Sequence, residues 1–155
     1  MLVGIDDISF YTANFSLDLQ ELAAHNGSDA AKYTVGIGQE RMSVPGADED
    51  VVTMAANASV PLLAGMKKRG EDPSLIRTIL LATETGIDQS KAAGVYLKSH
   101  LRLGSRCRVG ELKQAYYSAT AALQLACAWV ARKPKEKVLV IASDIARYDR
   151  QSPGE

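Results

Sequence analysis

The sequence predicts an α/β layered fold with a largely parallel sheet. Two continuous apolar runs, "IRTILLAT" at residues 76–83 and "KVLVIASD" at 137–144, are typical of strands covered on both faces. Segments with helical spacing alternate with strand-like segments along the chain, which favours parallel strands joined by helices. With 155 residues, the chain can bury one core of ordinary domain size.

The beginning of the chain is expected to contain a strand and a short helix. Residues 2–12 combine β-branched and aromatic side chains, which predicts a strand. Ser16 is expected to cap a short helix, and Gly27 is expected to end it. Residues 34–44 are punctuated by glycine and predict a loop with a short extended piece.

A long amphipathic helix is expected next, over residues 49–70. Asp48 is positioned to cap it, and its apolar residues recur every three or four positions. The basic residues 67–69 near its end suit the helix dipole. Pro61 lies inside the pattern, so we expect a kink there.

The second half continues the alternation of strand and helix. Apolar spacing and breaker residues predict, in order, a strand at 76–83, a helix at 90–101, a strand at 106–112, a helix at 116–132 and a strand at 137–144. We expect the whole of residues 1–155 to form a half-domain, truncated after the last of these strands.

Composition excludes several classes of protein. Eighteen basic and eighteen acidic residues cancel, so neither a nucleic-acid binder nor a membrane-surface protein is expected. No apolar run approaches the roughly 18 residues of a membrane span. Two cysteines do not make a disulfide framework. We therefore expect a cytoplasmic protein. We also expect it to use no metal or cofactor.

The first candidate for chemistry is "LATETGIDQSK", residues 81–91. Glu84 directly follows a predicted buried strand, and ligands of α/β sheets bind beyond the carboxyl ends of strands. Glu84 could serve there as a general acid or base. The alternative is structural, with Glu84 or Asp88 capping the next helix or turn.

The second candidate is "GELKQAYYSATAALQLACAWVAR", residues 110–132. It is expected to end a strand, turn, and begin a helix rich in small residues. A helix N-terminus offers free backbone N–H groups and would stabilise a thiolate in its first turn. A plain buried helix is the alternative.

Six stretches together resemble the amino-terminal half of the bacterial hydroxymethylglutaryl-CoA synthases. They are "GIDDISFYT", "GIGQERMSV", "DVVTMAANA", "TETGIDQSKAA", "ELKQAYYSATAALQLA" and "KVLVIASDIARY". The resemblance runs from residue 1 to about 148, with the stretches in the family's order and spacing. It implies a thiolase-like fold, seen as its first half, with a buried central helix.

The resemblance implies a condensation of acetyl-CoA with acetoacetyl-CoA in the mevalonate pathway of isoprenoid biosynthesis. Glu84 matches the family's glutamate, which acts as general acid and base. Asp144 matches an aspartate that helps to orient the site, and Tyr117 and Thr120 match residues that follow the nucleophile. The family's catalytic histidine lies beyond residue 155, and its members are usually homodimers.

The sequence departs from the family at the nucleophile. The family has Ala-Cys-Tyr where this chain has Ala115-Tyr116-Tyr117, so Tyr116 holds the cysteine position. A phenol ordinarily ionises near pH 10 and a thiol near about 8.5, so tyrosine is a poor substitute. Cys107 and Cys127 are too distant along the chain to replace the missing thiol. We therefore expect an acyltransferase that is inactive as the chain stands.

Two other functions remain open. "RCRVGELKQAYYSATA" also resembles synthases that install β-branches on polyketides, whose partner is an acyl carrier protein. Alternatively, Tyr116 marks a non-catalytic homologue that binds CoA or pairs with an active subunit.

Overall fold

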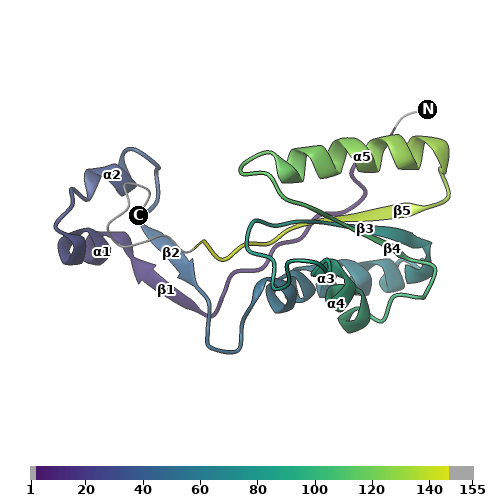
Figure 1. Cartoon of the computed structure of the whole chain (residues 1–155), viewed down its shortest axis with the longest axis horizontal. Coiled ribbons are helices and arrows are strands. Elements are labelled where there is room, and N and C mark those ends of the chain that lie inside the picture. Colours follow the sequence, from purple (N-terminus) through teal and green to yellow (C-terminus); the bar gives the residue numbers. More distant parts are fainter. Residues whose placement is uncertain (1–2, 147–155) are drawn as a thin grey trace. The chain divides into compact units, whose positions relative to one another are not determined.

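The structure is a computed structural model and describes residues 3–146. Two compact units are present: Thr12–Glu49 forms the smaller one, and the larger one combines the residues before Thr12 with those from Asp50 onward. Figure 1 labels the helices and strands of both units.

The smaller unit is a two-stranded antiparallel ribbon with two short helices. Strand β1 (Phe15–Asp18) pairs with strand β2 (Arg41–Val44), helix α1 spans Leu19–Asn26 and helix α2 spans Ala31–Thr34. The unit has a small core of its own, built on Leu19, Ala23 and Tyr33.

The predicted cap of the short helix was wrong by two residues. Asp18, and not Ser16, caps α1, because its carboxylate accepts a hydrogen bond from the N–H of Gln20 at 2.8 Å. Ser16 lies in β1 instead, opposite Ser43. The expected end of the helix is confirmed, since Gly27 adopts the left-handed conformation (φ 65°) that glycine tolerates best.

The larger unit is built on a three-stranded parallel sheet, as predicted. Strand β3 (Ile76–Ala82) lies in the middle, with β4 (Arg108–Leu112) on one side and β5 (Lys137–Ala142) on the other. Both neighbours run parallel to β3. Ala82 stands opposite Leu112 and Ala142, so the three strands end together at one edge.

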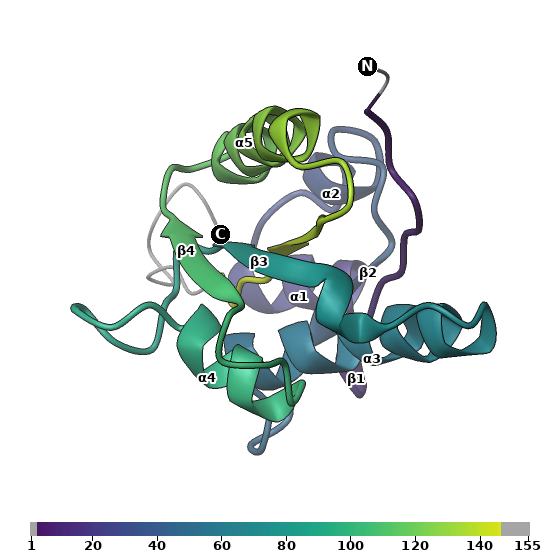
Figure 2. The same ribbon diagram turned by 90° about the vertical axis from the view of Figure 1, so that its right-hand side faces the viewer.

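Helices cover both faces of this sheet (Figure 2). Helix α5 (Ser118–Arg132) packs on one face, against β3 and β5. Helices α3 (Val51–Lys68) and α4 (Gly94–His100) pack on the other face. A short 3₁₀ helix, η1 (Pro73–Leu75), leads into β3.

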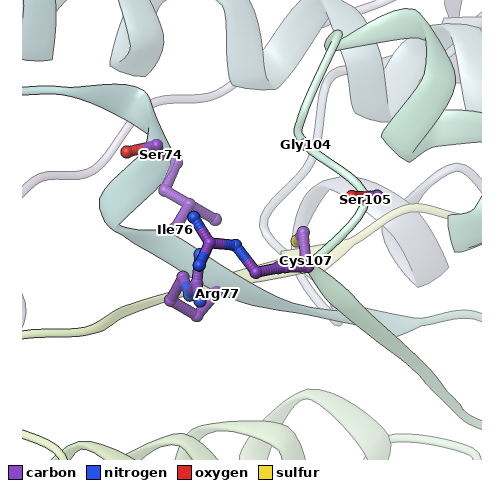
Figure 3. A pocket seen from close by; sticks show the side chains of 7 residues that line it. Ser74, Ile76, Arg77, Gly104, Ser105 and Cys107 are labelled. Atoms are coloured by element: carbon purple, nitrogen blue, oxygen red, sulfur yellow. The ribbon is translucent and has the colours of Figure 1, made fainter.

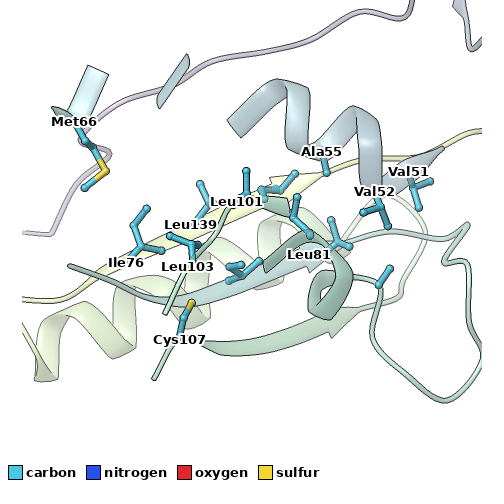
Figure 4. Packing of buried hydrophobic residues seen from close by; sticks show 14 residues of the cluster. Val51, Val52, Ala55, Met66, Ile76, Leu81, Leu101, Leu103, Cys107 and Leu139 are labelled. Carbon is cyan, nitrogen blue, oxygen red and sulfur yellow. The ribbon is translucent and has the colours of Figure 1, made fainter. Parts of the chain in front are cut away.

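The principal core lies between the sheet and the α3–α4 layer (Figure 4). Its side chains are apolar and shielded from solvent, with Ile79, Leu81 and Leu97 fully buried. On the other face, α5 buries a narrow stripe of small residues at four-residue spacing: Ser118, Ala122 and Ala126. Leu80 of the central strand packs against this stripe.

The cap of the long helix also differs from the sequence-based expectation. Asp50, and not Asp48, caps α3, because Asp50 accepts from the N–H groups of Val52 and Thr53 while the Thr53 hydroxyl accepts from the Asp50 N–H. This reciprocal pair stabilises the first turn. Pro61 lies inside the helix, which continues past it.

The strand predicted at residues 2–12 was wrong for its described part, because residues 3–12 form neither strand nor helix. No described strand pairs with them. Charged side chains hold this segment instead: Asp7 pairs with Arg69 of the α3 C-cap at 2.9 Å, and Asp6 pairs with Lys137 of β5.

Candidate functional site

Three of the candidate residues follow the carboxyl ends of the three strands of the parallel sheet. Glu84 comes two residues after β3, Tyr116 four residues after β4, and Asp144 two residues after β5. Since the strands are parallel and end in register, the three loops that carry these residues leave from one edge of the sheet. That edge is where α/β sheets ordinarily bind ligands.

Asp144 fastens the loop that carries Glu84. One of its carboxylate oxygens, Oδ1, accepts from the Glu84 N–H at 2.6 Å and from the Thr83 hydroxyl at 3.0 Å. It also accepts from the N–H and the hydroxyl of Thr85, at 3.2 and 3.1 Å. A carboxylate with several donors of this kind fixes the backbone around Glu84.

The two threonines beside Glu84 complete this network and were not singled out from the sequence. Thr83 is fully buried, and its hydroxyl accepts from the Thr85 N–H at 3.2 Å. The Thr85 hydroxyl accepts from the Ile145 N–H at 3.0 Å, which ties the β3 loop to the β5 loop a second time. The repeated pattern Thr-Glu-Thr was the available signal, since hydroxyls readily bond to nearby backbone groups.

Glu84 itself is exposed, and its carboxylate makes no hydrogen bond or ion pair within residues 3–146. The structural alternative therefore applies to Asp88, which accepts from the N–H groups of Ser90 and Lys91 at 2.8 and 2.9 Å. These bonds, the Lys91 bond foremost, hold the pKa of Asp88 below its usual range. Asp88 therefore stabilises a turn, whereas the carboxylate of Glu84 is exposed to solvent.

A second carboxylate supports the same loop from β4. Glu111 accepts from the N–H of Ala93 at 2.6 Å, just before α4 begins. A side chain at Gly86 would approach the Glu111 carboxylate to 3.0 Å, so the loop passes close over it. Glu111 thus connects the strand that leads to Tyr116 with the loop that carries Glu84.

Tyr116 stands at the apex of the turn between β4 and α5. Its backbone is left-handed, with φ 61°, which is uncommon for a residue other than glycine and costs energy. Its side chain is 99% exposed, so no packing contact offsets that cost. A strained turn that fully presents its apical side chain is typical of a functional position.

Helix α5 begins directly after this turn. Tyr117 occupies the N-cap position without a side-chain cap, and its hydroxyl bonds to the Gln124 side chain at 3.0 Å. Thr120 is exposed on the first turn. Cys107 is buried just before β4 and Cys127 is exposed further along α5, so neither thiol lies at the turn.

Within the part of the chain that the structure describes, no three His, Cys, Asp or Glu side chains group so as to hold a metal ion. None of the described helices combines the length and the apolar character needed to cross a membrane.

Comparison with known protein families shows which family the chain belongs to. The model of the family "Hydroxymethylglutaryl-coenzyme A synthase N terminal" matches residues 1–154. The chain belongs to this family. A hydroxymethylglutaryl-CoA synthase of Enterococcus faecalis is 43% identical over the full chain.

Two further synthases show the range of the family. The polyketide biosynthesis 3-hydroxy-3-methylglutaryl-ACP synthase PksG of Bacillus subtilis is 34% identical over 94% of the chain and 34% of its own length. The solved structure of MvaS in complex with 3-hydroxy-3-methylglutaryl coenzyme A superposes with a TM-score of 0.85 at 36% identity, covering 98% of this chain and 36% of that one. The thiolase-like fold is therefore confirmed.

The chain spans 39% of the length of the synthase from Enterococcus faecalis. It corresponds to the amino-terminal part of the family's fold, which carries the loops of Glu84, Tyr116 and Asp144.

Proposed function

We propose that this chain is the amino-terminal part of a hydroxymethylglutaryl-CoA synthase-like acyltransferase, whose reaction condenses acetyl-CoA with acetoacetyl-CoA. The observation that carries the proposal is that the three candidate loops leave from one edge of the sheet, in a chain whose family model matches residues 1–154. The mevalonate pathway of isoprenoid biosynthesis is the corresponding metabolic setting.

Each candidate residue has a role in this proposal. Glu84 acts as the general acid and base, because its carboxylate is exposed and free while its backbone is fixed by Asp144. Asp144 orients the loop and does not react. Tyr117 and Thr120, beside the turn, contact the acyl substrate.

Tyr116 makes the chain inactive in condensation as it stands. Forming an acyl-enzyme needs a nucleophile, and a thiolate is far more available near neutral pH than a phenolate. The tyrosine ring is also much larger than a thiol and would take space that we propose for the acyl group. The strained backbone at this position remains suited to presenting a thiol.

The test restores the thiol. Tyr116→Cys is made in residues 1–155 and combined with the remaining carboxy-terminal part of the Enterococcus faecalis synthase, then treated with radiolabelled acetyl-CoA. We expect one acetyl group on the introduced thiol by mass spectrometry, and none in the matched Tyr116→Ala protein. A Tyr116→Cys protein that binds acetyl-CoA but takes no label would overturn the proposal.

Glu84 is tested in the same background. The additional change Glu84→Gln should leave acetylation of the thiol in place and abolish condensation with acetoacetyl-CoA, because the acetyl methyl must lose a proton in that step. Unchanged condensation would remove Glu84 from its role.

A second candidate function is favoured by Tyr116 itself: a non-catalytic homologue that binds CoA or a partner subunit. Binding of acetyl-CoA to the unchanged chain, measured by calorimetry, with no turnover in the restored protein would select this function.

A third candidate follows from the similarity to PksG, whose name specifies an acyl carrier protein substrate. Acetyl transfer from a carrier protein in preference to acetyl-CoA would identify it.

We also infer a homodimer in the cytoplasm. Strands β4 and β5 are each hydrogen-bonded on one side only among the described strands, and such edges readily pair with another chain. Both cysteines are unpaired, which suits a reducing compartment. Sedimentation velocity gives the association state directly.

A further inference from the structure

A hollow lies at the other end of the sheet, where β3 and β4 begin. Its volume is about 200 Å³, and two segments form its walls (Figure 3). One wall is the passage from η1 into β3, and the other is the loop before β4; the lining residues are Ser74, Ile76, Arg77, Gly104, Ser105, Arg106 and Cys107. Strand β3 has 7 residues, which separates this hollow from the Glu84 loop by about 20 Å.

The charge of the lining is entirely positive. Arg77 and Arg106 both line the hollow, and no acidic residue does. Within residues 3–146, neither guanidinium makes an ion pair or a hydrogen bond, although other arginines such as Arg69 and Arg108 do. Two unpaired guanidinium groups beside one hollow leave a pair of forked donors open to a ligand.

A third cation shapes the same loop. The ammonium of Lys98 donates to the backbone oxygens of Ser105 and Cys107, at 3.2 and 2.8 Å. Carbonyl oxygens satisfy its hydrogen bonds without cancelling its charge. Burial raises the pKa of the Cys107 thiol, while the charges of Lys98, Arg77 and Arg108 act in the opposite direction. Three cationic side chains thus lie near the Cys107 thiol, while the Asp72 carboxylate bonds to Ser74 and Glu136 pairs with Arg108.

Of the two serines that line the hollow, only one has a free hydroxyl donor. Ser74 already donates its hydroxyl to Asp72 at 2.6 Å. The Ser105 hydroxyl donates to no group within residues 3–146, so it is available to donate toward the hollow. The site therefore combines two guanidinium groups and one hydroxyl, a donor set that suits an oxyanion and not a cation or an apolar group.

Size restricts the ligand further. Pockets for drug-sized molecules occupy about 300–1,000 Å³, and one water takes about 30 Å³ of liquid volume. A hollow of about 200 Å³ thus takes a small group such as a phosphate, and not a whole nucleotide.

We propose that Arg77, Arg106 and Ser105 form a binding site for a phosphate group, at the end of the sheet opposite Glu84. The site is independent of the condensation chemistry, since its residues belong to the strand beginnings and not to the loops at the strand ends. Its ligand is either free phosphate or the phosphate of a small ester.

The test is a titration of the ¹⁵N-labelled chain with inorganic phosphate, followed by NMR at constant ionic strength and near neutral pH. We expect saturable shifts of the amides of residues 104–107 and of the Arg77 and Arg106 side chains. Arg77→Gln combined with Arg106→Gln should weaken binding at least tenfold. Arg132→Gln, an exposed arginine at the end of α5, is the matched control and should bind as the unchanged chain does.

Two results would overturn the site. One is an equal set of shifts from sodium chloride at the same ionic strength, which would reduce the effect to screening. The other is binding in the folded double variant within threefold of the unchanged chain. Glycerol phosphate separates the two sources: an ester that shifts the same amides identifies an organic phosphate, and binding of inorganic phosphate alone identifies the free ion.

Discussion

The backbone at Tyr116 is the most constrained feature at the scale of single residues. A left-handed conformation costs a residue with a Cβ about 1–2 kcal/mol, and the exposed ring gains nothing in return. Glycine removes that cost but loses about 0.5–1 kcal/mol through the entropy of the unfolded chain. The balance favours glycine slightly.

We therefore predict that Tyr116→Gly raises the free energy of unfolding by up to about 1 kcal/mol. Tyr117→Gly is the control, because Tyr117 has an ordinary φ of −109° and its replacement should lower stability. Urea denaturation of both variants measures the difference. A loss of stability in Tyr116→Gly would show that the ring makes contacts that stabilise the turn.

Asp144 is the second residue on which the site depends. Removing its carboxylate leaves the buried Thr83 hydroxyl and the Glu84 N–H without their acceptor. We predict that Asp144→Ala lowers the unfolding free energy by about 1–2 kcal/mol, whereas Asp144→Asn, which keeps Oδ1, loses less.

Hydrogen exchange locates the effect of Asp144→Ala. The amides of Glu84 and Thr85 should exchange faster, while those in the middle of β3 should not. Equal protection of the two loop amides in the Asp144→Ala and unchanged chains would contradict the role of Asp144 as their anchor.

At the scale of elements, α4 approaches the sheet closely because it begins with glycine. A Cβ on Gly94 would lie 2.8 Å from Val109 of β4 and 3.6 Å from Leu81 of β3. Gly94→Ala would therefore push α4 away from the sheet, although alanine favours helix more than glycine does.

We predict that overpacking exceeds the gain in helix propensity, so that Gly94→Ala costs about 1–3 kcal/mol in unfolding free energy. Gly104→Ala, at a glycine with open space around its Cα, is the matched control and should change stability little. Thermal unfolding compares the two. A Gly94→Ala protein as stable as the control would mean that α4 can shift without loss.

At the scale of the whole larger unit, a chain of ion pairs joins segments that are distant in sequence. Arg69 pairs with Asp7 and Glu71, and Lys137 pairs with Glu71 and Asp6. The hydrogen bond from Arg69 foremost lowers the pKa of Asp7, and that from Lys137 foremost lowers the pKa of Glu71.

These shifts give a sign to the pH dependence of stability. A carboxyl whose pKa is lower in the folded chain binds protons more readily when the chain is unfolded. Its contribution to the free energy of unfolding is therefore fully present above its ordinary pKa and is lost as the pH falls. The ordinary values are 3.8 for Asp7 and 4.5 for Glu71. Stability should therefore fall as the pH is lowered from about 5 to 3.

Arg69→Gln should make this fall shallower, and so should added salt, because all the groups are near water. The urea midpoint measured at several pH values in this range checks both. A midpoint in Arg69→Gln that follows pH as steeply as in the unchanged chain would exclude the ion pairs as the cause.

The sequence determined the parallel sheet and the candidate loops. The runs at 76–83 and 137–144 are apolar without alternation, which is typical of a strand covered on both faces. Glu84 and Asp144 come directly after these runs, so the sequence placed both residues at strand ends. The helix after β4 was also predicted, but it begins at Ser118 and not at residue 116, which leaves Tyr116 in the turn.

Tertiary structure decided the features that the local sequence pattern left ambiguous: the cap of α3, the conformation of residues 3–12 and the partners of Asp144. Asp48 and Asp50 are equally good caps by composition, and the helix begins where Thr53 can return the hydrogen bond. Residues 3–12 have strand-like side chains but find no described strand to pair with, so ion pairs hold them instead. The bonds that bring Asp144 to Thr83 and Thr85 span about sixty residues, a distance over which chain periodicity carries no information.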